Sequence, residues 1–216
     1  MNYGFYGRLS ADFPSQIVVD ATELCNFACI HCPHPEYKRT EHYQGRSLLP
    51  DLNAKMVSEV AEFGRGITKY IRYTSNGEPL INRHIFAMLA DASVGSMTPV
   101  CLTTNGSLLN HSRREKLLSA GIHLVDISID ALEDETYAKI RVNGDLAVTR
   151  ANVLDLIREK RIVGSDLKVI VSYVEQPQNA HETDDFERYW QDQGADFVVI
   201  RRLHSSAGAI QDIAID

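Results

Sequence analysis

Three of the four cysteines in this chain lie within eight residues, at Cys25, Cys29 and Cys32. A thiolate is a soft and strong ligand for iron or zinc, so a loop with this C-x3-C-x2-C spacing can hold a metal centre. Three protein ligands leave one coordination position open, and an open position can bind a small molecule and react with it. The spacing therefore predicts a reactive metal centre.

Three further polar clusters follow predicted strands, as the cysteine loop does. They are Asn76-Gly77-Glu78-Pro79, Thr104-Asn105-Gly106 and the pair Ser128 and Asp130. In parallel β/α barrels the carboxyl ends of the strands gather on one face, and active sites are built there. We therefore expect all four clusters to converge.

Runs of β-branched and aromatic residues predict six strands, at 17–19, 69–73, 100–103, 123–129, 167–174 and 197–200. Apolar residues at helical spacing lie between them. Helix starts are predicted at Asp51 or Asn53, at Asn110 or Ser112, and at Thr183; Gly64 is expected to end the first of these helices. This alternation predicts an α/β fold, a partial parallel (β/α)6 TIM-like barrel.

Composition agrees with one globular domain spanning 1–216, since 216 residues with 44% hydrophobic content can bury one sizeable core. The net charge of -7 argues against a nucleic-acid partner. We find no signal-peptide core and no apolar run that could span a membrane. Clustered cysteines do not resemble a disulfide framework, which favours the cytoplasm. Cys101 is expected to be a small buried hydrophobe.

The motifs together resemble those of radical S-adenosylmethionine (radical SAM) enzymes, over nearly the whole chain. His31 fills the aromatic position before the last cysteine. The segment 76–79 is similar to the family's Gly-Gly-Glu-Pro, with Asn76 in place of the first glycine. Ser128-Ile129-Asp130 resembles the family's Ser-x-Asp, and Arg141 resembles an arginine of the branch that carries a SPASM or twitch domain.

The resemblance implies one 4Fe–4S cluster on the three cysteines, with S-adenosylmethionine chelating the fourth iron. Reductive cleavage would give a 5′-deoxyadenosyl radical that takes a hydrogen atom from a peptide or small-molecule substrate, with sugar-type molecules among the candidates. An electron donor such as flavodoxin or ferredoxin is implied as a partner, and the protein's task is to position the cofactors.

The expected cofactor-binding residues are His31, Gly77, Glu78, Asn105, Ser128, Asp130 and Arg141. By resemblance, backbone around 77–79 would receive the methionyl amine, and Arg141 would pair with the methionyl carboxylate. Ser128 and Asp130 would bind the ribose or the methionyl end, and His31 would pack near the adenine.

Other interpretations stay open from the residues alone. A zinc site could use the three cysteines with His31 or His34, giving a non-catalytic module. A glycyl-radical-enzyme activase is an alternative within catalysis. Glu78 could be a carboxylate at a helix N-terminus, and residues 104–106 could form an ordinary turn.

The last residues bear on substrate and domain organisation. Tyr173, Glu175, Arg201 and His204 end the fifth and sixth predicted strands and could meet substrate. The segment 201–208 resembles the one that leaves strand six in SPASM-type enzymes, where a cysteine-rich extension follows. We expect a single cluster here: either the auxiliary clusters are absent, or the sequence is a fragment or a minimal member without the extension after about residue 208.

Overall fold

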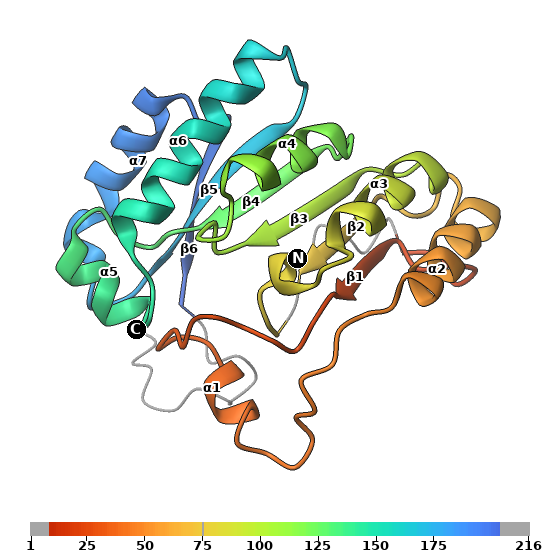
Figure 1. Ribbon diagram of the computed structural model, residues 1–216, viewed down its shortest axis with the longest axis horizontal. Helices are drawn as coiled ribbons and strands as arrows, with labels where there is room; N and C mark the ends of the chain where they lie inside the picture. The colour runs from red at the N-terminus through yellow and green to blue at the C-terminus, as the bar shows by residue number, and fades with distance from the viewer. Residues whose placement is uncertain (1–8, 75, 204–216) are drawn as a thin grey trace.

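The computed structural model describes residues 9–74 and 76–203, which form one curved parallel sheet with helices on its outer side (Figure 1). The sheet order is β1-β2-β3-β4-β5-β6, and every neighbouring pair is parallel. The strands are β1 Gln16–Asp20, β2 Tyr70–Thr74, β3 Val100–Thr104, β4 Leu124–Ser128, β5 Lys168–Glu175 and β6 Phe197–Arg202. This architecture confirms the predicted partial barrel.

Six helices connect or follow the strands: α2 Pro50–Phe63, α3 Ile85–Gly95, α4 His111–Ser119, α5 Asp134–Ile140, α6 Leu146–Ile162 and α7 Thr183–Gln193. Three short helical turns were not predicted: α1 His34–Tyr37, η2 Pro79–Ile81 and η3 Ala180–Glu182. Pro35 does not prevent α1, because it lies in the first turn, where a missing N–H is tolerated.

The core lies between the sheet and the helices. On β2, Ile71 and Tyr73 are fully buried, while the alternate residues Tyr70, Arg72 and Thr74 are partly exposed. Alternate side chains of a strand point to opposite faces, so the first set packs under the helices and the second faces the concave side. Polar residues on that concave side are therefore available for function.

The first long helix starts earlier than predicted. Its N-cap is Leu49 and Pro50 occupies the first turn, so neither Asp51 nor Asn53 caps it. Proline fits the first helical position because its φ is already helical. Asn53 is instead buried, where it accepts a hydrogen bond from the Tyr73 hydroxyl.

Two other predicted helix ends are confirmed, and α7 begins at Thr183 as predicted, although Thr183 does not cap it. Asn110 caps α4, accepting from the backbone N–H of Arg113, and Gly64 lies at the C-terminal end of α2. Thr183 makes no capping hydrogen bond, because its hydroxyl donates to Glu175 at 2.8 Å. The hydroxyl of Thr183 thus contacts the end of β5 and does not cap its own helix.

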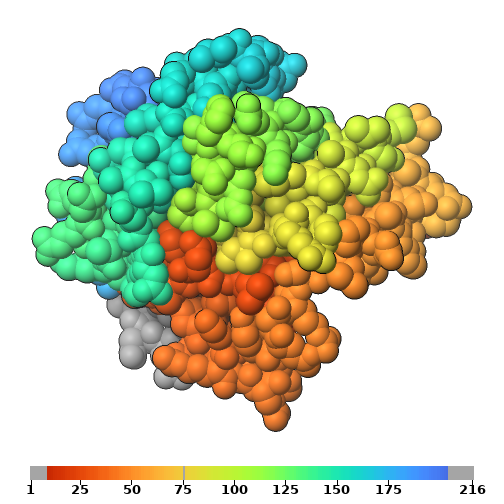
Figure 2. Space-filling model, in the orientation of Figure 1, coloured from red at the N-terminus to blue at the C-terminus, as the bar shows by residue number. Residues whose placement is uncertain are grey.

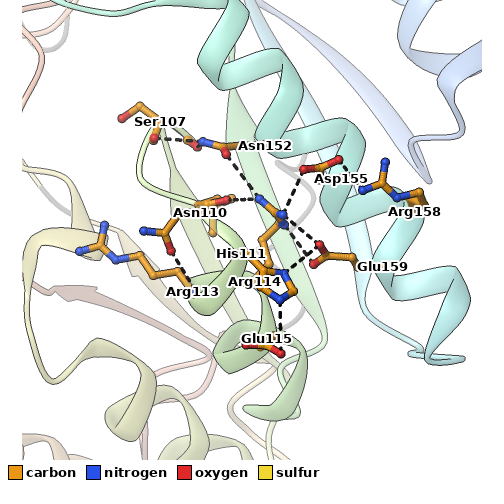
Figure 3. Close-up of polar contacts among 12 residues, drawn as sticks. Ser107, Asn110, His111, Arg113, Arg114, Glu115, Asn152, Asp155, Arg158 and Glu159 are labelled. Carbon is orange, nitrogen blue, oxygen red and sulfur yellow. Dashed lines mark hydrogen bonds and ion pairs between the residues drawn. The ribbon is translucent and has the colours of Figure 1, made fainter.

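A buried arginine joins α4 to α6 (Figure 3). Arg114 is 5% exposed; its Nη2 lies 2.9 Å from Glu159 Oε1 and 3.1 Å from Asp155 Oδ2. Its Nη1 donates to the carbonyl of Leu109 at 2.8 Å. The guanidinium thus joins the two helices and also binds the backbone of the loop after β3.

We expect Arg114→Ala to lower the free energy of unfolding by about 3 kcal/mol, because removing one partner of a buried ion pair leaves the others uncompensated. Urea denaturation measures the loss. Arg158→Ala is the control, since Arg158 is 64% exposed and pairs with the same Asp155; it should cost about 1 kcal/mol or less. Equal losses of unfolding free energy in the two variants would show that the buried ion pairs of Arg114 stabilise the fold no more than an exposed pair does.

Candidate active site

The predicted polar clusters converge on one cavity of about 220 Å³ at the carboxyl ends of the strands. Its lining includes Cys25, Cys29, His31, Cys32, Gly77, Glu78, Asn105, Ser128 and Arg141, together with Phe27, Pro33, Thr74, Asn76, Pro79, Thr103, Thr104 and Val174. In Figure 2 the red segment that carries the cysteine loop lies in a central recess among later segments. The loop after β1, the C-terminal ends of β2 to β5 and the end of α5 thus meet at one place.

The cysteine loop is fixed by backbone and side-chain contacts from three elements. The N–H groups of Ala28 and Ile30 donate to carbonyls in the segment after α5 and at its end, at 3.0 and 3.1 Å. The side chain of Asn26 accepts from Asn105 Nδ2 at 3.0 Å and donates to Ser107 Oγ at 2.9 Å. Asn105 therefore holds the cysteine loop in place. The polar side chain of Asn26 within the cysteine motif could have indicated that the loop has such a partner.

Glu78 joins the ends of β2 and β3. Its carboxylate accepts from Thr104 Oγ1 at 2.6 Å, from the Asn105 N–H at 2.7 Å and from the Leu80 N–H at 3.0 Å. The side chain is buried, and this burial raises the pKa of Glu78. Its carboxylate thus caps η2 and braces the cavity wall, as the alternative interpretation of a helix N-terminal carboxylate expected.

Gly77 lets this wall approach the cysteine loop. A Cβ atom at Gly77 would lie 2.2 Å from the carbonyl oxygen of Leu24 and 2.6 Å from that of Thr22. The next residue, Glu78, donates its N–H to Leu24 O at 2.7 Å. Only glycine fits between these backbones, so the sequence 77–79 sets the distance between β2 and the loop.

Arg141 is clamped beside the cysteines. It is 6% exposed; its Nη2 lies 2.5 Å from Asp130 Oδ2 and its Nη1 lies 3.6 Å from Cys29 Sγ. Its Nε is buried and has no hydrogen-bond partner within the described residues. A buried donor left free beside a cavity is suited to an acceptor on a bound molecule.

Asp130 was expected to touch the cofactor, but the structure places it behind Arg141, outside the cavity lining. It is completely buried and its φ of 68° is left-handed, a conformation that non-glycine residues rarely adopt. This turn directs its carboxylate to Arg141 and to the N–H of Val174, 2.7 Å away. Strain of this kind is stored where it positions functional groups.

Two residues after β5 were missed by the sequence reasoning. Gln176 Nε2 lies 3.3 Å from His31 Nδ1, and buried Asn179 donates to the carbonyl of Asp130 at 2.9 Å. Burial, with the nearby charge of Arg141, lowers the pKa of His31 to about 4, so its ring is neutral at pH 7. Gln176 and Asn179 lie just after a strand, as the predicted polar clusters do, and this position could have marked them as site residues.

The cysteine sulfurs of the described structure are not gathered as closely as ligands of a single zinc ion would be. Around one zinc, sulfurs would lie about 3.8 Å apart, whereas the three cysteines form no group of ligand atoms within 4.8 Å of one another in the described residues. His34 is 3% exposed with Nε2 2.8 Å from the carbonyl of Glu23, so it is engaged elsewhere. Burial raises the pKa of the Cys25 thiol to about 11, so metal binding must displace its proton.

Comparison with known proteins identifies the family. The model of the Radical SAM superfamily matches residues 19–188. The chain belongs to the radical SAM superfamily. Its members are enzymes that use a 4Fe–4S cluster and S-adenosylmethionine, which confirms the predicted family, the enzyme class and both cofactors. The match does not favour the non-catalytic zinc module.

Two curated relatives of this radical SAM chain carry the name GTP 3′,8-cyclase. A probable GTP 3′,8-cyclase of Methanococcus maripaludis is 32% identical over 148 residues, covering 68% of this chain and 46% of the relative. A GTP 3′,8-cyclase of Saccharophagus degradans is 28% identical over 209 residues, covering 92% of this chain and 58% of the relative. The chain thus spans about half the length of these relatives.

Solved structures share the fold at low identity. Streptococcus suis SuiB bound to the precursor peptide SuiA has a TM-score of 0.69 at 16% identity, over 95% of this chain and 43% of that one. Methylornithine synthase (PylB) has a TM-score of 0.65 at 11% identity, over 88% of this chain and 53% of that one. These radical SAM structures support the partial barrel alone.

The described residues include no helix long and apolar enough to cross a membrane.

Proposed function

We propose that this chain is the catalytic core of a radical SAM enzyme whose cluster is held by Cys25, Cys29 and Cys32. The observation that carries the proposal is that these thiols line one cavity with Gly77 and Arg141. Three thiolates fit a 4Fe–4S cluster with one iron left for S-adenosylmethionine. When bound, these cofactors supply a 5′-deoxyadenosyl radical that takes a hydrogen atom from substrate.

The side chains around the cavity have distinct proposed roles. Backbone at 77–79 receives the methionyl amine, and the Arg141 guanidinium holds the methionyl carboxylate through a charge-assisted hydrogen bond. Ser128 contacts the ribose and neutral His31 packs near the adenine. Asp130 is a positioning residue, because its carboxylate fixes Arg141 and does not itself line the cavity.

The concave side of the sheet supports an anionic substrate. Arg72 of β2 and Arg201 of β6 both approach Asp126 Oδ2, at 3.3 and 2.8 Å. Asp126 is buried, whereas the two arginine side chains are 30% and 40% exposed. Two guanidinium groups share one carboxylate, so one positive charge is left for a phosphate or carboxylate group.

We therefore propose a phosphorylated small molecule as substrate, with a purine nucleotide first, in place of a peptide or sugar-type molecule. The name GTP 3′,8-cyclase of the relatives supports this class. The cellular electron donor is proposed to be flavodoxin or ferredoxin.

The test uses anaerobically reconstituted protein with dithionite and S-adenosylmethionine. We expect 5′-deoxyadenosine in the products, and a faster release with GTP than with guanosine, since guanosine lacks the anionic group. Arg72→Ala should raise the GTP concentration for half-maximal stimulation about tenfold, the effect of losing about 1.4 kcal/mol. Arg39→Ala, at a 73% exposed side chain, is the matched control.

Each outcome bears on a separate claim. Absence of 5′-deoxyadenosine from protein with a full iron content would contradict the activity. Equal stimulation by GTP and guanosine would contradict the anionic substrate while leaving the activity intact.

A further inference from the structure

Three potential metal ligands meet outside the cysteine cavity. Glu133 lies at the start of α5, and His181 and Glu182 lie in η3 before α7. One ligand atom from each lies within 4.8 Å of the other two. None of the three residues lines the cavity of the cysteines, so this trio is a separate feature.

Glu182 carries an observation of its own. It is 4% exposed, and its Oε2 accepts from the N–H groups of Leu132 and Glu133. Its Oε1 is buried and lacks a hydrogen-bond partner within the described part of the chain. A buried carboxylate oxygen without a donor is costly, and it calls for a cation.

The potential partner of this oxygen is His181 Nε2, which lies 3.5 Å from Glu182 Oε1. This separation is longer than an ordinary N–H···O hydrogen bond, which is about 2.9 Å. Two ligands of a tetrahedral zinc ion, with bonds of about 2.1 Å, lie about 3.4 Å apart. The spacing of nitrogen and oxygen thus suits a shared metal ion better than a direct hydrogen bond.

The charges agree with this geometry. Two carboxylates with one neutral imidazole balance a divalent cation, whereas without it Glu133 and Glu182 oppose each other at short range. Arg150 comes from α6, but its guanidinium donates to the carbonyl of Leu132. We propose that Glu133, His181 and Glu182 bind a divalent transition-metal ion such as zinc, with water in the remaining coordination position.

The ion would clamp two connections that hold the active site. Glu182 donates its N–H to the carbonyl of Asn179 at 2.8 Å, and Asn179 donates to the carbonyl of Asp130. Asp130 in turn fixes Arg141. A metal at this place fastens the start of α5 to the loop after β5 and so stabilises the wall behind Arg141. The proposal does not depend on the substrate or on the radical chemistry.

The test measures zinc and iron on the same reconstituted protein, equilibrated anaerobically with zinc and desalted. We expect one zinc per chain beside the four irons of the cluster. His181→Ala and Glu133→Gln should lose the zinc and keep the iron. His42→Ala is the matched control, because His42 is exposed and its side chain lies outside the trio.

A thermal scan gives the second readout. Zinc at a hundredfold excess over Kd should raise the Tm of the wild type by about 5 °C or more, and leave that of His181→Ala unchanged. Equal zinc content and equal Tm shifts in the wild type and His181→Ala would overturn the proposal. Wild-type protein that binds no zinc would also overturn it and would show that His181 and Glu182 form an ion pair only. The iron count reports on the cluster separately.

Discussion

Replacement of Cys29 by alanine is expected to abolish cluster assembly, so that iron falls from about four atoms per chain to a trace. Cys29 is 8% exposed, lines the cavity and has its Sγ 3.6 Å from Arg141 Nη1. Without it, two thiols remain, and the guanidinium of Arg141 loses its contact with the sulfur. Two ligands on one loop cannot hold the cluster against loss of its irons. Iron and sulfide analysis after anaerobic reconstitution measures the effect.

Cys101→Ala is the matched control for this variant. Cys101 is also buried, at 7% exposure, but it belongs to β3 and lies outside the cavity lining. It should therefore keep its iron. A Cys29→Ala protein with the wild-type iron content and wild-type cleavage of S-adenosylmethionine would rule out the ligand set proposed here.

Gly77→Ala is expected to have the next largest effect. Its methyl group would lie 2.2 Å from the carbonyl oxygen of Leu24, which is backbone and cannot rotate away. The chain must then separate β2 from the cysteine loop and weaken the hydrogen bond from Glu78 N to Leu24 O. We expect the affinity for S-adenosylmethionine to fall at least about tenfold, and the free energy of unfolding to fall by about 2 kcal/mol.

Calorimetric titration and urea denaturation measure these two quantities. Gly95→Ala is the control, because its new methyl would meet the side chain of Val57 at 2.7 Å, which can adjust, and alanine favours the helix. Unchanged cofactor affinity in Gly77→Ala would show that the close approach at Leu24 does not shape the site.

The sequence was sufficient for the fold because each strand was a β-branched or aromatic run followed by polar residues. Parallel strands gather their carboxyl ends, so the meeting of the cysteine loop, Gly77, Asn105 and Ser128 could be predicted. The Asn110 cap was readable for a similar reason, since it depends on residues three apart.

Side-chain directions at the strand ends could not be predicted in the same way. The carboxylate of Glu78 finds Thr104 and Asn105 across the sheet, 26 and 27 residues away. The left-handed backbone of Asp130 depends on partners after β5, such as Asn179. These contacts join residues that are far apart in the chain, so the spacing of residues in a single sequence does not predict them.

Two sequence predictions lie outside the described residues. They are the substrate contact of His204 and the extension after about residue 208. Both stay predictions, as does the assignment of 1–216 to one domain.

Electron–nuclear double resonance of the reduced holoenzyme, with S-adenosylmethionine labelled with nitrogen-15 at the amine and oxygen-17 at the carboxylate, tests the central claim most directly. The claim is that three cysteines leave one iron free and that this iron takes the methionyl end of the cofactor. We predict hyperfine coupling from both labels to the cluster in the wild type. A fully loaded cluster that shows no coupling to either label would contradict the account.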